Sequence, residues 1–271
     1  MSLSPFCRLE AVPRITFNDA RPELLARQRP LIITDALEGS SARRRWSLEH
    51  LKQIAGARSV PVEYSLRPIY RPHPKLNRGR YFRKEMSLAQ CLDLIMAPHQ
   101  RGAWHYLSAL SIKEFLPELL SELETPALLP LSRYHSASLY LGNSGSGSQL
   151  HYDITDNLLA VFIGKKRVTL LPPGQLSQLY PLSPKSFACN TSRVNIEQRE
   201  PERFPRFRDL SAVTAEVSAG ELLYLPRTWW HHTVNEGLTL GVTFSWRAPM
   251  WELARWRYLR TYLPYLLEAF G

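Results

Sequence analysis

The sequence of 271 residues has few cysteines and no long apolar run. Its three cysteines, Cys7, Cys91 and Cys189, are odd in number and none has C-x-x-C spacing, so neither a disulfide framework nor a zinc ribbon is indicated. No segment approaches the roughly 20 apolar residues that span a bilayer, and the first residues, MSLSPFCRLEAVPR, lack the apolar stretch of a signal peptide. We therefore expect a cytoplasmic protein in a reducing compartment, without a membrane partner.

Acidic residues are also scarce. Lys and Arg total 34 against 24 Asp and Glu, giving a net charge of +10, which favours anionic partners such as nucleic acid or acidic peptides. No repeat, low-complexity segment or linker is visible, and a chain of this length can bury a core without cross-links. We expect one domain with extensions.

The residue pattern changes twice along the chain. Residues 1–132 form a helical or mixed region, with helices expected over 17–29, from Ser87, and from Ser111 to about Glu124. Ser87 and Gln90 have capping-box spacing, and Cys91 falls on the apolar face that follows. Residues 133–246 contain about eight short strands separated by turns, typical of an antiparallel sandwich or barrel. Residues 247–271 return to a helical pattern. The strands are SASLYLG, SQLHYD, NLLAVFI, KRVTLLP, TAEVSA, ELLYLP, WWHHTVN and LTLGVTFSW.

Two of these strands carry residues that can bind a metal. Side chains i and i+2 of a strand share a face, so His151 and Asp153 project together. His231 and His232 follow in LYLPRTWWHHTV. Two histidines and one carboxylate with open positions form the facial triad of non-haem Fe(II) oxygenases. Each part alone is commonly an ordinary strand residue, and only their joint occurrence in an all-β segment indicates a site.

Residues 133–246 resemble the JmjC and cupin-like family of Fe(II)- and 2-oxoglutarate-dependent oxygenases. The resemblance lies in HYDITDNLLAVFIGKKRVTLLPP, VNIEQREPERFPRF and SAGELLYLPRTWWHHTVNEGLTLGVTFSW, and extends more weakly to the front of the chain. It implies a mainly β fold with flanking helices around a double-stranded β-helix, or jelly roll. Residues 1–132 would pack on this core, and 247–271 would follow it as a helical tail. It also implies Fe(II), 2-oxoglutarate as co-substrate, and dioxygen.

The same resemblance assigns roles to single residues. His151, Asp153 and His231 would bind the iron, while His232 faces the other side of its strand by alternation. Lys166, in the G-K-K-R turn, would pair with the distal carboxylate of 2-oxoglutarate.

Four further residues match family positions that contact the co-substrate. Tyr106, Ser148 and Asn157 would donate or accept hydrogen bonds there, although each is also an ordinary strand hydroxyl or turn amide. Thr243 stands where better-known relatives have asparagine. A hydroxyl cannot replace both ends of an amide, so the hydrogen bonding near the iron is expected to differ.

The resemblance implies hydroxylation of a C–H bond in a macromolecule, first of all in a protein or peptide side chain. Hydroxylation of a tRNA nucleoside is the alternative, favoured by the D-N-L-L and G-K-K-R-V matches and by the net charge. N-methyl-lysine demethylation uses the same chemistry. A cupin-like binding protein without catalysis is a further alternative, against which the intact triad and Lys166 argue.

Two other segments predict contacts with partners. Residues 67–84 contain seven cations, interspersed aromatic residues and no acidic residue. Such a segment suits an anionic macromolecule, and Arg71, Arg78 and Arg80 are its candidate substrate-binding residues. Residues 249–270 are rich in Trp, Tyr and Leu, and we expect this tail to mediate homodimerisation.

Overall fold

The computed structural model describes residues 6, 8–65, 83–97, 104–130, 132, 134–183, 186, 188–197 and 200–247. Arg71, Arg78, Arg80 and the tail over 249–270 lie outside these ranges, so the expectations for them stay predictions. Within the described ranges, every helix is too short or too polar to cross a membrane.

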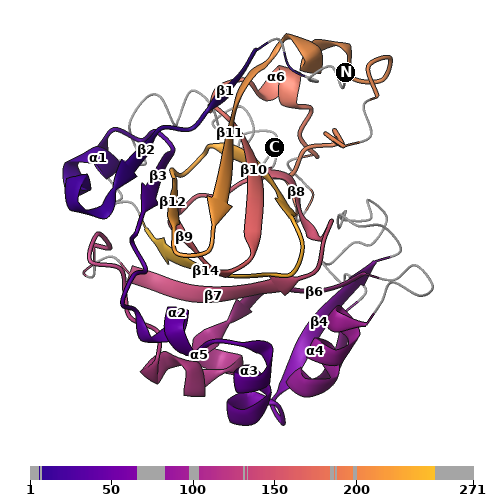
Figure 1. Ribbon diagram of the computed structural model, residues 1–271. Helices are drawn as coiled ribbons and strands as arrows, with labels where there is room; N and C mark the ends of the chain where they lie inside the picture. The colour runs from indigo at the N-terminus through magenta and orange to yellow at the C-terminus, as the bar shows by residue number, and fades with distance from the viewer. Residues whose placement is uncertain are drawn as a thin grey trace.

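Two β-sheets face each other and build the body of the molecule (Figure 1). The smaller sheet has the order β1 (Arg8–Ala11), β11 (Ser211–Ser218), β10 (Lys165–Leu171), β13 (Trp230–Asn235), β8 (Gly147–Tyr152). The larger sheet has the order β2 (Arg14–Thr16), β3 (Leu31–Thr34), β12 (Leu222–Leu225), β9 (Asp156–Ile163), β14 (Thr239–Trp246), β7 (Tyr134–Gly142), β6 (Trp104–Ser111), β4 (Ser59–Ser65), β5 (Arg83–Ser87). All eight strands expected over 133–246 are present, and the jelly-roll prediction is confirmed.

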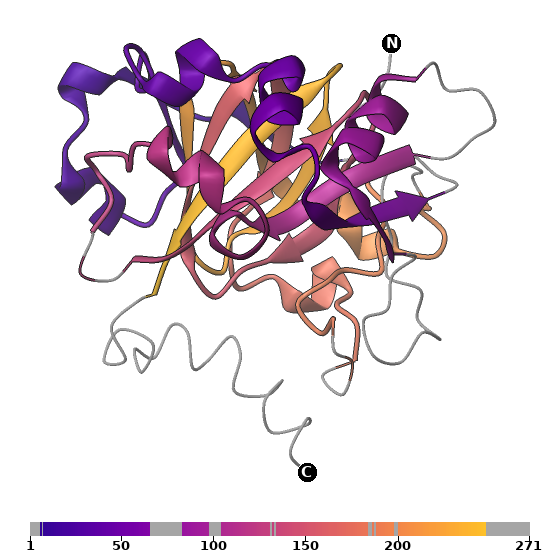
Figure 2. The same cartoon turned by 90° about the horizontal axis from the view of Figure 1, so that it is seen from below.

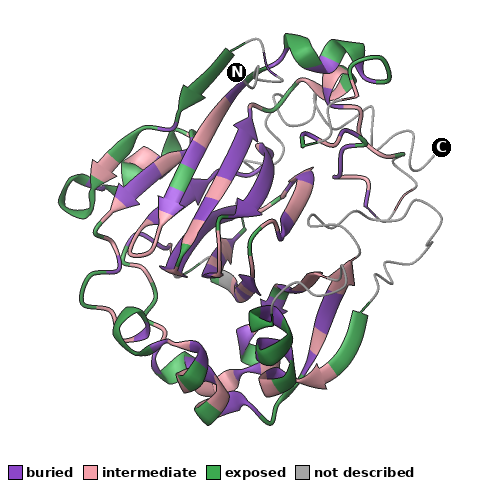
Figure 3. Ribbon diagram, turned by 45° about the vertical axis from the view of Figure 1, so that its right-hand side comes forward, coloured by how far each residue is buried: buried purple, intermediate pink, exposed green. Residues whose placement is uncertain are grey.

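Strand β9 is apolar on both faces because both faces are covered. Leu158, Ala160 and Phe162 point to the helices, whereas Leu159 and Val161 point into the space between the sheets. This explains the continuous apolar run of the sequence, which is typical of a strand buried on two sides. Figure 3 shows the barrel strands largely buried and the outward sides of the helices exposed.

Helices cover the outer face of the larger sheet, as Figures 1 and 2 show. They are α2 (Ser41–Arg45), α3 (Leu48–Ala55), α4 (Leu88–Met96) and α5 (Ile112–Phe115). Trp46, which ends α2, packs on Phe162 with ring centroids 4.9 Å apart. Helix α4 begins with the predicted capping box of Ser87 and Gln90, and Cys91 is fully buried. Burial raises the pKa of the Cys91 thiol to about 12.

Two of the predicted helices are wrong in extent, for one physical reason. The segment 17–29 contains a 3-10 turn, η1 (Phe17–Asp19), and α1 (Pro22–Ala26), while the segment from Ser111 contains α5 and η2 (Pro117–Ser121). A proline disfavours the helical conformation of the residue before it. Arg21 is accordingly extended, at φ −134° and ψ 146°, and Leu116 lies outside the helical region, at φ −134° and ψ 52°, so both interrupt the helical pattern.

The region before residue 133 takes part in the sheets as well as covering them. Strands β2 to β6 all belong to the larger sheet, and one apolar core joins the helices to β9 and β14. On the other side of the molecule, α6 (Leu176–Leu179) and η4 (Pro205–Asp209) lie over the end of the smaller sheet. The barrel is thereby covered on both sides.

Candidate metal centre

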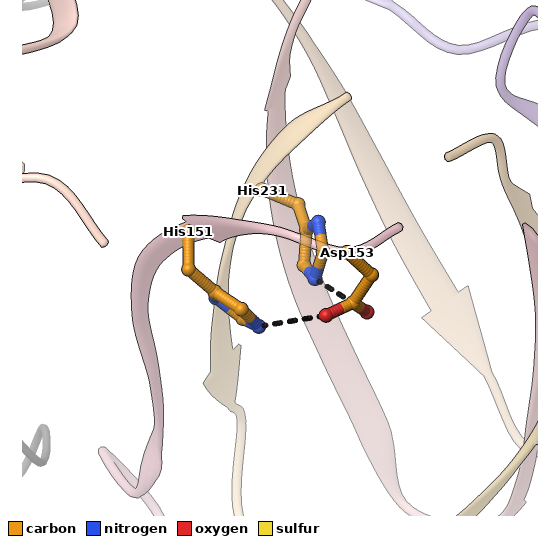
Figure 4. A group of neighbouring side chains, drawn as sticks. All are labelled: His151, Asp153 and His231. Carbon is orange, nitrogen blue, oxygen red and sulfur yellow. Dashed lines mark ion pairs between the residues drawn. The ribbon is translucent and has the colours of Figure 1, made fainter. Parts of the chain in front are cut away.

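His151, Asp153 and His231 meet inside the barrel, where their ligand atoms all lie within 4.8 Å of one another. His151 Nε2 is 3.9 Å from Asp153 Oδ1, and His231 Nε2 is 3.7 Å from Asp153 Oδ2 (Figure 4). His151 and His231 are paired across β8 and β13, with ring centroids 4.2 Å apart. The structure thus brings together the three residues that are expected from the sequence to bind iron.

Backbone carbonyls fix how the two imidazoles point. His151 Nδ1 lies 2.7 Å from Gln149 O, and His231 Nδ1 lies 3.0 Å from Trp229 O. A carbonyl can only accept, so each Nδ1 carries the proton and each Nε2 presents its lone pair to the centre. Burial, reinforced by the neighbouring His151, lowers the pKa of His231 to about 4 and keeps it neutral at pH 7. Neutral imidazoles are the form that binds a metal.

His232 lies on the other face of β13, as alternation predicts. Its Nδ1 is 3.9 Å from Glu197 Oε1, and it does not line the pocket that holds the three ligands. Burial and the nearby Arg167 lower the pKa of His232 to about 3, so it is neutral as well. The choice of His231 over His232 agrees with this geometry.

Asn157 supports Asp153 directly. Its Nδ2 donates to Asp153 Oδ2 at 2.9 Å, and its Oδ1 accepts from Ser245 Oγ at 2.6 Å and from Thr155 Oγ1 at 3.3 Å. These hydrogen bonds fix the amide so that its NH₂ end faces the carboxylate. The structure therefore places Asn157 against a metal ligand, and its contact with a co-substrate stays a prediction. Ser245 was not anticipated.

A pocket of about 380 Å³, including its open mouth, surrounds the three ligands. Ile154, next to Asp153, is 74% exposed, so this side of the site faces solvent. The lining residues are Tyr140, Ser148, His151, Asp153, Asn157, Leu159, Lys166, Leu225, His231, Thr233 and Thr243.

Lys166 lines this pocket and is the charged group expected for the co-substrate. Only 2% of the residue is exposed, and its Nζ lies 5.3 Å from the centroid of the Tyr140 ring. Within the described ranges no carboxylate forms an ion pair with it. Burial lowers the pKa of Lys166 to about 8, so the ammonium remains mostly charged at pH 7. A buried cation with no counter-ion among these described residues is suited to bind an anion.

The remaining co-substrate candidates lie close by, but not all in the pocket. Ser148 and Thr243 line it, whereas Tyr106 lies behind Tyr140, with ring centroids 6.4 Å apart. Burial and the neighbouring Tyr140 and Glu63 raise the pKa of Tyr106. The nearby Ser148 hydroxyl has the opposite effect and lowers the pKa of Tyr106 in part. Among the described residues, however, the Tyr106 hydroxyl has no partner at both the distance and the angle of a hydrogen bond.

Ser148 lines the same pocket as His151 only because strand β8 contains a bulge. Simple alternation would turn Ser148 away from His151, three residues later. The pairing with β13 shifts, so that Ser148 opposes Thr233 while His151 opposes His231. The extra residue in β8 restores a common face for the two side chains.

Sequence reasoning missed Tyr140 and Thr233. Thr233 lies two residues after His231 on the same strand, and the same alternation would have placed it in the pocket. Its Oγ1 accepts a hydrogen bond from the Ser148 backbone at 3.0 Å. Tyr140 comes from β7, and no local motif marks it. Burial, with the charges of Asp153 and Glu63, raises its pKa, so it is a neutral hydroxyl.

The family is decided by a match to known cupin-like domains over residues 18–251. The chain belongs to the cupin-like domain family. Members of its JmjC group use Fe(II) and 2-oxoglutarate, and the His151, Asp153 and His231 set has the two imidazoles and one carboxylate that suit Fe(II).

Individual relatives of this cupin-like protein are distant. It is 26% identical to lysine-specific demethylase 8 of Xenopus tropicalis over 87% of this chain and 53% of that protein. It is 28% identical to Jumonji C domain-containing protein 5 of Drosophila melanogaster (91% of this chain, 64% of that one). It is 25% identical to tRNA wybutosine-synthesizing protein 5 of Mus musculus over 90% of this chain and 78% of that protein. The chain thus spans about half to two thirds of the length of the first two of these relatives.

The residues present fit the metal and the co-substrate. The two imidazoles and one carboxylate converge, the imidazoles are oriented by second hydrogen bonds, and Lys166 offers a buried charge without a protein counter-ion in the described ranges. His151, Asp153 and His231 would hold Fe(II), and Lys166 would hold the far carboxylate of 2-oxoglutarate.

Proposed function

We propose that this cupin-like protein is an Fe(II)- and 2-oxoglutarate-dependent oxygenase that hydroxylates a C–H bond of a macromolecule, in the first place a protein or peptide side chain. One observation carries the proposal: three ligand atoms within 4.8 Å share a pocket with a buried lysine that forms no ion pair within the described part of the chain. When bound, Fe(II), 2-oxoglutarate and dioxygen supply the oxidation of the C–H bond.

The chain's own residues bind, orient and exclude water. His151 and His231 direct their Nε2 lone pairs inward because their Nδ1 protons are held by backbone carbonyls. The amide of Asn157 holds Asp153 Oδ2 and so orients the carboxylate. Leu159 and Leu225 add apolar surface, which limits water around the centre.

The test measures the metal content and the turnover of 2-oxoglutarate in the wild type and in two histidine variants. We expect one Fe(II) per chain and formation of succinate from 2-oxoglutarate, even without the true substrate. His231→Ala should abolish both. His232→Leu, on the opposite face of the same strand, should retain both. Loss of metal in His232→Leu with retention in His231→Ala would contradict the ligand set, and absence of succinate from the metal-loaded wild type would refute the proposed activity.

A tRNA nucleoside is the second candidate substrate. Two observations support this candidate. The chain matches 78% of the length of the mouse wybutosine-synthesizing protein, a larger share than it matches of the demethylase relatives. The net charge of +10 also suits a polyanion such as tRNA. Comparing peptide and tRNA pools from cells with and without the protein by mass spectrometry separates the two candidates, since the hydroxylated pool gains one oxygen atom. Release of formaldehyde would instead identify N-methyl demethylation.

A further inference from the structure

A buried ion pair lies beside the metal centre, and the proposed chemistry makes no use of it. Asp156 and Arg227 are 1% and 5% exposed, and Asp156 Oδ2 is 3.1 Å from Arg227 Nη2. Asp156 Oδ1 accepts from the backbone N–H of Arg227 at 3.0 Å and lies 3.0 Å from the Tyr224 hydroxyl. Both carboxylate oxygens are therefore engaged.

Gln28, directly after the first helical turns of the chain, closes the network. Its Nε2 donates to Asp156 Oδ1 at 3.1 Å, and its Oε1 accepts from Arg227 Nε at 3.1 Å. Its backbone carbonyl accepts from Trp229 Nε1 at 3.0 Å. The segment around Arg227 is thus fixed to β9 and to the N-terminal region at the same time.

The turn that this network holds touches both metal-binding segments. The backbone N–H of Thr228 donates to Asp153 O at 2.7 Å, and Trp229 O accepts from His231 Nδ1 at 3.0 Å. Thr228 has φ of +67°, a conformation that is strained for a β-branched residue. A strained turn persists only where its surroundings hold it.

We infer that Asp156 and Arg227 are positioning residues that hold the Arg227–Trp229 turn and thereby set the place of His231 relative to Asp153. The inference rests on the proposed function, because it concerns the affinity of the same centre for its metal. Removing the Asp156 charge takes a carboxylate away from the buried Arg227 guanidinium and breaks the contacts that join Asp156 to the turn, so the turn should relax and His231 should shift. Loss of a group that orients a metal ligand weakens the binding of the metal.

The test is Co(II) titration of the full-length protein, with the visible spectrum reporting ligand geometry. Asp156→Asn turns an NH₂ group towards the Arg227 guanidinium. We expect Co(II) to bind about 10-fold or more weakly and its spectrum to change. The Kd and the spectrum are readouts that a loss of stability alone would not move in the folded fraction.

A matched control is Glu122→Gln, another buried carboxylate. Glu122 is 7% exposed, accepts from Trp46 Nε1 at 3.0 Å and is 3.1 Å from Arg45 Nη2, among the helices outside the larger sheet. This change should lower the Tm and leave the Co(II) Kd within about twofold, since none of its partners touches the metal turn.

The possible outcomes distinguish a failure of the positioning role from a failure of the proposed function. If Asp156→Asn lowers the Tm as Glu122→Gln does and keeps the wild-type Kd and spectrum, the pair is only structural and the inference is overturned. Should Asp156→Asn fail to fold, Tyr224→Phe decides, because it removes a single hydroxyl from the network. Weaker Co(II) binding supports the inference, and unchanged binding overturns it. Failure of the wild type to bind Co(II) would refute the proposed function itself.

Discussion

At the scale of single residues, the burial of Lys166 lowers the stability of the folded protein. Its ammonium is buried without a carboxylate partner in the described ranges, and burial lowers its pKa to about 8. Below pH 8 the folded protein carries this buried charge, so the cost is fully present. Between pH 8 and 10.5 the folded protein loses the proton before the unfolded chain does, and the cost declines.

Lys166→Met should therefore stabilise the protein while removing co-substrate binding. The lowered pKa corresponds to a gain of up to about 3 kcal/mol in unfolding free energy at pH 7. Thermal unfolding and a 2-oxoglutarate titration measure the two effects. The gain should shrink as pH rises from 8 to 10.5.

Lys165→Met is the control for that substitution. Lys165 is adjacent in sequence but pairs with Glu216 at 2.7 Å and with Glu236 at 3.3 Å on the partly exposed side of the strand. Its loss should leave 2-oxoglutarate binding intact and change stability little. Equal loss of 2-oxoglutarate binding in both variants would show that Lys166 has no particular role.

At the scale of elements, the pairing of β8 with β13 decides which side chains line the pocket. Gly147 begins β8 opposite Val234, and a Cβ at this position would lie 1.9 Å from Thr233 O. Only glycine permits this approach, and the bulge that turns Ser148 inward follows directly.

Gly147→Ala should accordingly push the two strands apart. We expect a loss of roughly 2–4 kcal/mol in unfolding free energy, as for other severe steric clashes, together with weaker metal binding through His151 and His231. Gly241→Ala is the control, because its Cβ would meet Ala160 O at 3.1 Å and need only a small adjustment. Chemical denaturation and Co(II) titration measure the effects. Equal results for the two variants would argue against a special role of the β8 approach.

The elements also explain what the sequence could and could not predict. Period-two alternation correctly separated His231 from His232, and the apolar runs gave the eight strands, because both signals are local. The face of Ser148 depends on a bulge, which alternation cannot foresee. The contacts of Asp156 with Arg227 join residues 71 apart, and those of Gln28 with Arg227 join residues 199 apart. No local pattern carries such information.

At the scale of the whole molecule, the tail over 249–270 is predicted to mediate homodimerisation. This segment lies outside the described residues, and the expectation rests on the apolar surface that its Trp and Leu residues would present. Light scattering at micromolar concentration should give twice the mass of the chain, and removal of residues 249–271 should give a monomer. A monomeric full-length protein would contradict the prediction.

The charge of the whole molecule leads to the prediction for the substrate. With a net charge of +10, the protein should attract an anionic macromolecule, and Arg71, Arg78 and Arg80 lie in its most basic segment. The described strands on either side, β4 and β5, pair antiparallel, and Glu63 of β4 opposes both Arg83 of β5 and Tyr106 of β6. The described strand β4 thus lies between β5 and Tyr106 of β6, and this placement of the strands that flank the basic segment in sequence is why we expect that segment to contact the substrate.

Replacing Arg71, Arg78 and Arg80 together by alanine should weaken substrate binding and reduce its dependence on salt. Each lost phosphate contact lowers the slope of log K against log[salt] by about 0.7–0.9 for a nucleic acid. Uncoupled turnover of 2-oxoglutarate should hardly change, because the three metal ligands and Lys166 are untouched. The matched control replaces Arg43, Arg44 and Arg45, three cations of α2 on the helical side of the larger sheet, and should leave substrate affinity as it is. Equal affinity in both triple variants and the wild type would reduce the basic segment to a solubilising loop.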